Sequence, residues 1–148
     1  MNARLLSEIG GQRTFAVVFA TGDDVMPGLL AFARKHRISA GSFTAIGAFE
    51  RVTLGYFEMA RRDYAHIEIG EQVEVLSLAG NVALTDEGPK VHAHVVVGKS
   101  DGTAHGGHLL GARVRPTLEV IVIESPAHLR RTSDPATGLP LLDLEKSS

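Results

Sequence analysis

The sequence contains no cysteine, which excludes both a disulfide framework and a thiolate metal site. It also lacks an apolar run long enough to cross a bilayer, and its N-terminus lacks the charged-then-apolar pattern of a secretory signal peptide. We therefore expect no membrane partner and a cytoplasmic protein.

An excess of positive charge is missing as well. The formal net charge is −2 and the sequence pI is about 6.4, whereas proteins that bind duplex DNA through its phosphates are usually basic or carry a basic stripe. Basic residues gather only in short groups, which we interpret as solvated ends of elements: 34–37, 61–62 and 130–131. The charge pattern therefore disfavours a strong DNA-binding protein.

The length and composition predict one globular domain. The 148 residues are 44% hydrophobic and 22% charged, which is enough for a single domain with a real core. No internal repeat, low-complexity segment or linker divides the chain. We assign residues 1–148 to this domain, with its core at about 14–142 and both ends loose.

Residues 24–37 are predicted to form the main helix. Asp23 and Asp24 supply a helix start, and Pro27 is tolerated in the first turn. Apolar residues then recur at helical spacing, while the basic group at 34–37 suits the negative end of the helix dipole.

Most of the remaining chain has the pattern of β-strands. Short connections favour antiparallel pairing, so the fold class is α+β, a mainly antiparallel sheet with one main helix packed on it. Two strands are apolar on both faces, and one helix covers only part of one face; we therefore expect a homo-oligomer. The predicted strands are 14–19, 41–49, 52–57, 64–69, 73–84, 91–98 and 118–124, followed by a terminal hairpin around the turn at 134–138.

Four of the seven histidines lie in two neighbouring clusters. His92 and His94 occupy a predicted strand, where alternation directs both side chains to one face, roughly 7 Å apart. His105 and His108 follow a turn signal at 99–102, so a hairpin would bring them back beside the first pair. The residues alone leave two interpretations open, a metal site or a polar patch on a solvated face.

Other chemistries have weaker support. No serine stands in a Gly-x-Ser-x-Gly elbow, and the glycines of the predicted strands do not form a phosphate-binding loop before a helix. His36, His66 and His128 stand singly, and we interpret all three as non-functional.

Five motifs in order resemble the plants-and-prokaryotes-conserved (PPC) domain: GSFTAIGAFERVTLGYF, EVLSLAGNVAL, VHAHVVVG, HGGHLLGARVRPTLEVIV and RRTSDPATGLPLL. The resemblance covers about residues 14–142. It implies an α+β fold, an antiparallel sheet with a helix packed on it, assembled as a homotrimer. It also implies the metal site of prokaryotic members, carried here by His92, His94 and His108, whereas His105 lies outside the usual pattern.

The resemblance also concerns the question of DNA binding. Plant members follow an AT-hook and are nuclear DNA-binding regulators, but they tend to lack these histidines. This chain has the histidines and no Arg-Gly-Arg-Pro AT-hook, which places it with the stand-alone prokaryotic branch, whose function is largely unassigned. A DNA-binding, transcription-regulatory module is the alternative interpretation, and a scaffold in which the trimer itself is the function ranks third.

Three neutral imidazoles suit zinc and leave one position for water or substrate, as in catalytic rather than structural sites. We expect a zinc-binding protein that acts on or senses a small molecule; the sequence does not decide whether it is a zinc-dependent enzyme. Gly106 and Gly107 would let the backbone pass close to the site. A carboxylate that orients a ligand histidine would come from Glu50, Glu58, Glu68, Asp101 or Glu119.

Overall fold

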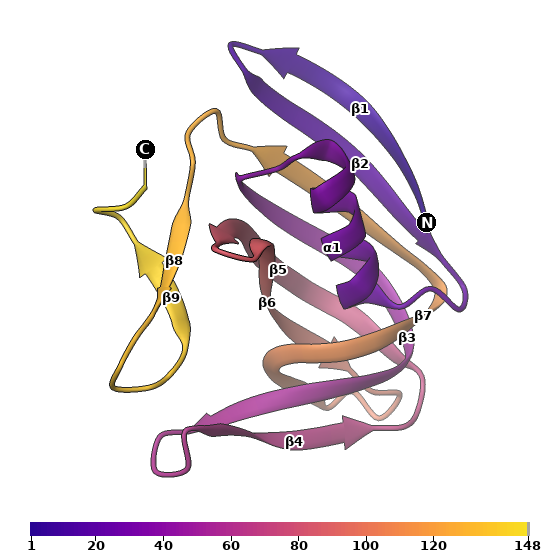
Figure 1. Cartoon of the computed structure of the whole chain (residues 1–148). Coiled ribbons are helices and arrows are strands. Elements are labelled where there is room, and N and C mark those ends of the chain that lie inside the picture. The colour runs from indigo at the N-terminus through magenta and orange to yellow at the C-terminus, as the bar shows by residue number, and fades with distance from the viewer. Residues whose placement is uncertain (148) are drawn as a thin grey trace.

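The computed structural model describes residues 1–147. In this part of the chain nine strands and one helix follow one another in the order β1 (Asn2–Ile9), β2 (Gln12–Ala20), α1 (Val25–His36), β3 (Ala40–Glu58), β4 (Asp63–Ile69), β5 (Val73–Thr85), β6 (Gly88–Gly98), β7 (Ala104–Glu124), β8 (Arg130–Ser133) and β9 (Pro140–Asp143). The predicted class, a mainly antiparallel sheet with one short helix, is confirmed (Figure 1).

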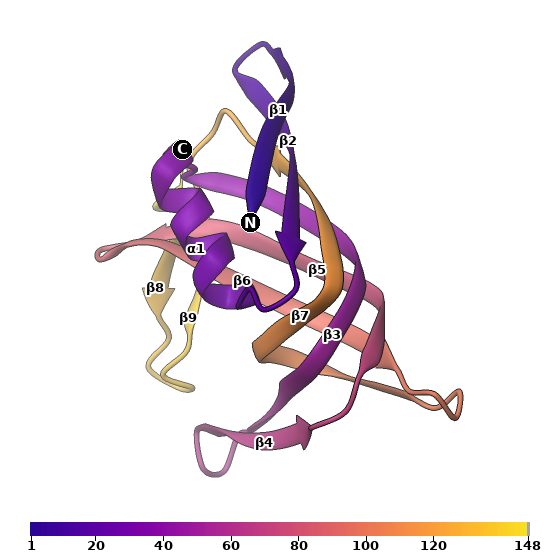
Figure 2. The same ribbon diagram turned by 90° about the vertical axis from the view of Figure 1, so that its right-hand side faces the viewer.

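The sheet is strongly curved because two long strands take part in several pairings (Figure 2). β3 pairs with both β5 and β7, and β6 pairs with the same two strands, so these four strands form a closed circuit. The β1–β2 hairpin extends the sheet beyond β7, and β4 extends it beyond β3. All these pairings are antiparallel; the one parallel pairing among the described residues joins β5 to β8.

Helix α1 lies against the concave side of the sheet (Figure 1 and Figure 2). Its apolar residues Val25, Leu29, Phe32 and Ala33 are buried in the core with the inner side chains of the strands. Asp24 is the N-cap residue, and the helix ends at Arg37. The helix predicted at 24–37 is therefore confirmed, although the Asp24 side chain makes no capping hydrogen bond. No helix of residues 1–147 has the length and apolar character needed to span a membrane.

Three segments differ from the pattern that the sequence predicts. Residues 2–9, which show no period, form β1; every side chain of this strand is exposed, so no alternation of burial marks it. The strands expected at 41–49 and 52–57 are one continuous strand, β3. It bends at Gly47, where φ is +148° and a Cβ would lie 2.3 Å from a backbone oxygen of β7. β7 also continues through Pro116. The pairing of β7 with β3 is irregular at this point, and Pro116 lies within the irregularity.

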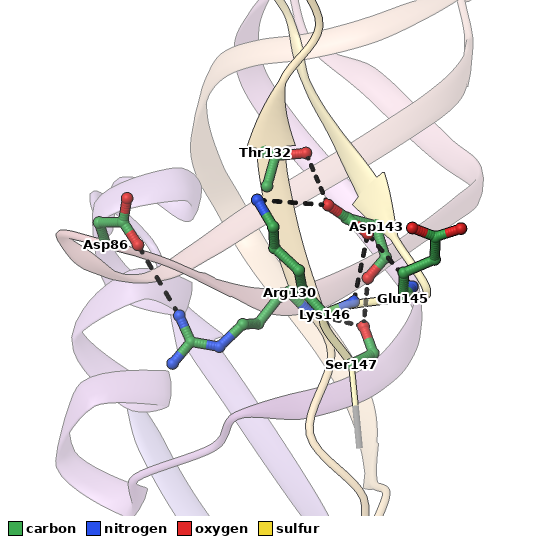
Figure 3. Close-up of polar contacts among 7 residues, drawn as sticks. All are labelled: Asp86, Arg130, Thr132, Asp143, Glu145, Lys146 and Ser147. Carbon is green, nitrogen blue, oxygen red and sulfur yellow. Dashed lines mark hydrogen bonds and ion pairs between the residues drawn. The ribbon is translucent and has the colours of Figure 1, made fainter.

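The predicted terminal hairpin is present as β8 and β9. It is attached to the rest of the molecule by the main chain and by side chains (Figure 3). Arg130 makes an ion pair of 3.7 Å with Asp86 in the β5–β6 turn, and its backbone N–H donates to Oγ of Ser147. Thr132 donates to Asp143 across the hairpin at 3.1 Å. The ion pair with Asp86 and a backbone hydrogen bond from Leu84 to the carbonyl of Leu129 hold β8 beside β5. The second residue of β8, Arg131, thereby reaches Asn81 on β5.

Candidate metal centre

The strands bring His92, His94 and His108 together as the sequence predicts. Along β6 the side chains alternate, so Val91, Ala93 and Val95 enter the core while His92 and His94 project from the opposite face. The β6–β7 hairpin then places His108 directly across from His94 in the register. The predicted return of the second histidine cluster beside the first is confirmed.

The three imidazoles form a nearly equilateral triangle. The ring centroids are 5.1 Å apart for His92 and His94, 5.1 Å for His92 and His108, and 5.3 Å for His94 and His108. One nitrogen from each ring can be chosen so that all three lie within 4.8 Å of one another. His92 and His108 are half-buried and His94 is exposed, so the cluster opens to solvent on one side.

His108 is the most enclosed member of the cluster. The ring of Tyr64, on β4, stacks on it with the centroids 4.6 Å apart. Gly55 on β3 makes room for Tyr64, because a Cβ at that position would lie 2.7 Å from the tyrosine ring. The close approach at Gly107 is to the backbone of β3 rather than to the histidines, since a Cβ at this position would lie 2.9 Å from the carbonyl oxygen of Gly55. At Gly106 the nearest contact would be looser, at 3.3 Å.

Burial and neighbouring positive charge keep two of the imidazoles neutral. Desolvation, with smaller effects of His92, His94 and Lys90, lowers the pKa of His108 to about 4. Desolvation also lowers the pKa of His92, followed by the positive charge of Arg131. A neutral imidazole carries the free lone pair that a metal ion needs.

The donor set fits a metal ion. Nδ1 of His108 is buried and has no hydrogen-bond partner within residues 1–147, although buried polar atoms in folded proteins are nearly always satisfied. Within residues 1–147 the cluster contains three histidines and no carboxylate. Three converging neutral nitrogens, one of them buried and unpartnered, match the preference of zinc and other imidazole-binding transition metals.

The carboxylates expected to orient these histidines lie elsewhere. Glu50 is 3.8 Å from Arg113, Glu58 pairs with Arg61, and Asp101 accepts hydrogen bonds from Thr103. Glu68 and Glu119 are exposed on their strands. In the described part of the chain none of the five candidates joins the cluster.

The other four histidines are separate from the cluster. His105 is exposed, with Oγ1 of Thr103 3.5 Å from its ring. His36 packs against the aromatic rings of the core, and His66 is exposed on β4. His128 shares a hydrogen bond with Ser39 at 2.5 Å.

Residues remote in sequence complete the surroundings of the site. A cavity of about 130 Å³ lies beside His92 and His108 and is also lined by Tyr64, Lys90 and Arg131. None of the last three was predicted. The pairing register of the strands is the one signal that would have linked Arg131 to the histidines. Asn81 accepts a hydrogen bond from Arg131 and lies directly across from His92.

Comparison with known proteins gives a family match and several close structures. The sequence model of the Plants and Prokaryotes Conserved (PCC) domain matches residues 6–126. A candidate DNA-binding protein from Bacteroides thetaiotaomicron is 30% identical, with a TM-score of 0.86 over 97% of this chain and 99% of that chain. A metal-containing protein from Archaeoglobus fulgidus is 35% identical, with a TM-score of 0.82 over 95% and 98%.

One curated relative is much longer than this chain. The bifunctional protein GlmU of Synechococcus sp. (strain JA-3-3Ab) is 32% identical over 140 residues, which are 93% of this chain and 21% of that protein. The chain therefore spans about a fifth of the length of this relative.

Proposed function

The chain belongs to the Plants and Prokaryotes Conserved domain family, and from this premise we propose that it is a zinc-binding protein whose ion is held by His92, His94 and His108. The observation that carries the proposal is the buried Nδ1 of His108, which has no hydrogen-bond partner in the described part of the chain and belongs to a set of three converging imidazoles. The similarity to the metal-containing protein from Archaeoglobus fulgidus supports it.

The arrangement suits a site that handles a small molecule. Zinc bound by three histidines would keep one coordination position open, lower the pKa of a bound water and polarise a carbonyl or phosphoryl group. Tyr64 covers one face of His108 and excludes water from it, while the exposed side of His94 leaves a route from solvent. We therefore infer a role in acting on or sensing a small molecule, in the cytoplasm.

We further propose that the protein is a homotrimer. On the face of the sheet opposite to α1, Val18, Ile46, Ile121 and Ile123 are 41–62% exposed and lie on the neighbouring strands β2, β7 and β3. An apolar surface of this kind is typical of an interface between subunits. Light scattering should give three times the mass of the chain, and a monomer at micromolar concentration would contradict the assembly.

Metal analysis tests the central proposal. Protein purified without a histidine tag and incubated with excess zinc should retain about one ion per chain after gel filtration. His94→Gln should lose the ion, whereas His105→Gln should keep it; both side chains are exposed and lie on the same hairpin. Equal zinc content in these two variants, or none in the wild type, would remove the proposal.

A second candidate function is a DNA-binding, regulatory module. The similarity to the candidate DNA-binding protein from Bacteroides thetaiotaomicron favours it, and the net charge of −2 disfavours it. A mobility-shift assay with duplex DNA at ~50 mM salt decides, because phosphate contacts are strongest at low ionic strength. A salt-sensitive complex would support the module, and no shift would exclude it.

A further inference from the structure

Arg131 is a buried cation that has no acidic partner among the described residues. The residue is 9% exposed. Nη1 donates to the carbonyl of Pro140 at 2.8 Å, and Nη2 donates to Oδ1 of Asn81 at 2.6 Å. Both acceptors are neutral, and the buried Nε–H has no acceptor among the described residues. A buried charge is unfavourable unless it is paired, so this guanidinium lacks the negative group that would balance it.

The preceding residue on the same strand, Arg130, forms the solvent-exposed ion pair that is typical of arginine. Arg130 is exposed and pairs with Asp86 at 3.7 Å (Figure 3). Among residues 1–147 no carboxylate makes such a pair with Arg131. The contrast between these neighbours points to a negative partner for Arg131 that residues 1–147 do not supply.

The space next to Arg131 is the cavity beside the histidines. Its lining includes His92 and His108, the cations Arg131 and Lys90, and residues 139–141, which form an apolar wall. A volume of about 130 Å³ holds several waters or a ligand of a few heavy atoms. The lining contains two cations, two neutral imidazoles and no acid, so its potential is positive even without a metal ion.

From these contacts we propose that the cavity binds a small organic carboxylate, which Arg131 recognises through its free N–H groups while a second polar group of the ligand reaches the histidine site. The inference rests on the proposed function for the second contact only. A guanidinium carries five N–H donors in one plane, and Asn81 and Pro140 use two of them. The remaining donors suit the planar, two-oxygen geometry of a carboxylate.

The apolar wall favours an organic carboxylate over inorganic phosphate as the ligand. Inorganic phosphate would match the charge of Arg131 and Lys90, but it would leave residues 139–141 in contact with a fully hydrated group. A carboxylate on a short carbon skeleton places its charge at Arg131 and its methyl or methylene groups against this wall. The substrate class inferred for the site is therefore a carboxylic acid of a few carbons with a hydroxyl or carbonyl group near the carboxylate.

The experiment measures binding, with zinc content determined first on every sample. Titration calorimetry on zinc-loaded protein would use 2-hydroxyisobutyrate, acetate, neutral acetamide and inorganic phosphate as probes. Arg131→Met should weaken binding of 2-hydroxyisobutyrate at least about tenfold, whereas Arg130→Met, the matched control, should change it less than about twofold. Circular dichroism checks folding; if Arg131→Met does not fold, Arg131→Lys replaces it and should weaken binding through loss of the planar fork.

A second readout is independent of the metal. In metal-free protein the ¹⁵N–¹H signal of the Arg131 side-chain Nε–H should shift on addition of acetate and stay unchanged with acetamide. Wild type that holds no zinc but shows this shift would overturn the proposed function and leave the carboxylate site standing. Zinc-loaded wild type that ignores both carboxylates, binds phosphate more tightly than either, or binds equally well with Arg131→Met would overturn the carboxylate site alone.

Discussion

Protonation of His108 offers a quantitative test of the environment of the site. In metal-free protein the pKa of this imidazole should be about 4, against 6.5 for an ordinary histidine, chiefly because burial removes water from the ring, one face of which is stacked on Tyr64. The unfolded chain therefore binds more protons at His108 than the native chain between pH 6.5 and 4. The stability associated with the neutral ring is complete above pH 6.5 and is lost as the pH falls toward 4.

The size of the effect follows from the same shift. A fall in pKa from 6.5 to about 4 corresponds to roughly 3 kcal/mol between the two protonation states, and partial exposure of the ring reduces this to about 2 kcal/mol. Carboxylates titrate in the same pH range, so the wild type must be compared with His108→Gln. Between pH 7 and pH 4 the free energy of unfolding should fall by about 2 kcal/mol more in the wild type than in the variant.

Two measurements on chelator-treated protein check this reasoning. Urea unfolding at each pH gives the free energies, and the ring carbon–proton signals in an NMR titration give the pKa directly. Tyr64→Ala should raise the pKa of His108 toward its ordinary value, because the covering ring is removed. A wild-type pKa near 6.5, or no change in Tyr64→Ala, would refute the assignment of burial as the cause.

Gly107→Ala should destabilise the protein by about 1 kcal/mol more than Gly106→Ala, because only the first brings a Cβ within 3.0 Å of a backbone oxygen on β3; equal urea midpoints would contradict this. Arg13→Met should lower the free energy of unfolding by about 2 kcal/mol, since it leaves Glu124, which is 7% exposed, without the guanidinium that donates to it at 2.8 Å. The control Arg61→Met breaks an exposed pair and should stay within about 0.5 kcal/mol; similar losses in both would show that burial of the pair is irrelevant.

Strand periodicity and local turn signals were enough to predict most of the elements of the fold. The helix at 24–37 and the hairpin that joins His94 to His108 follow from patterns spanning only a few residues. The exposed strand β1 could not be found in this way, because it is held by backbone pairing with β2 and buries no side chain. The continuity of β3 was missed because the charged residues Glu50 and Arg51 interrupt the run of strand-forming residues, although the pairing with β7 continues past them.

The residues of the candidate site also differ in whether local sequence patterns could predict them. His92, His94 and His108 lie within 17 positions of one another and share one hairpin, so alternation and a turn signal are enough to bring them together. Arg131 reaches the cavity only because β8 returns to pair with β5, and β5 places Asn81 across from His92. In the sequence Arg131 belongs to the pair 130–131, which has the pattern of the solvent-exposed end of an element. The feature that distinguishes it from Arg130 is burial without a counter-charge, which arises from tertiary structure alone, and it is this feature that assigns a negatively charged ligand to the site.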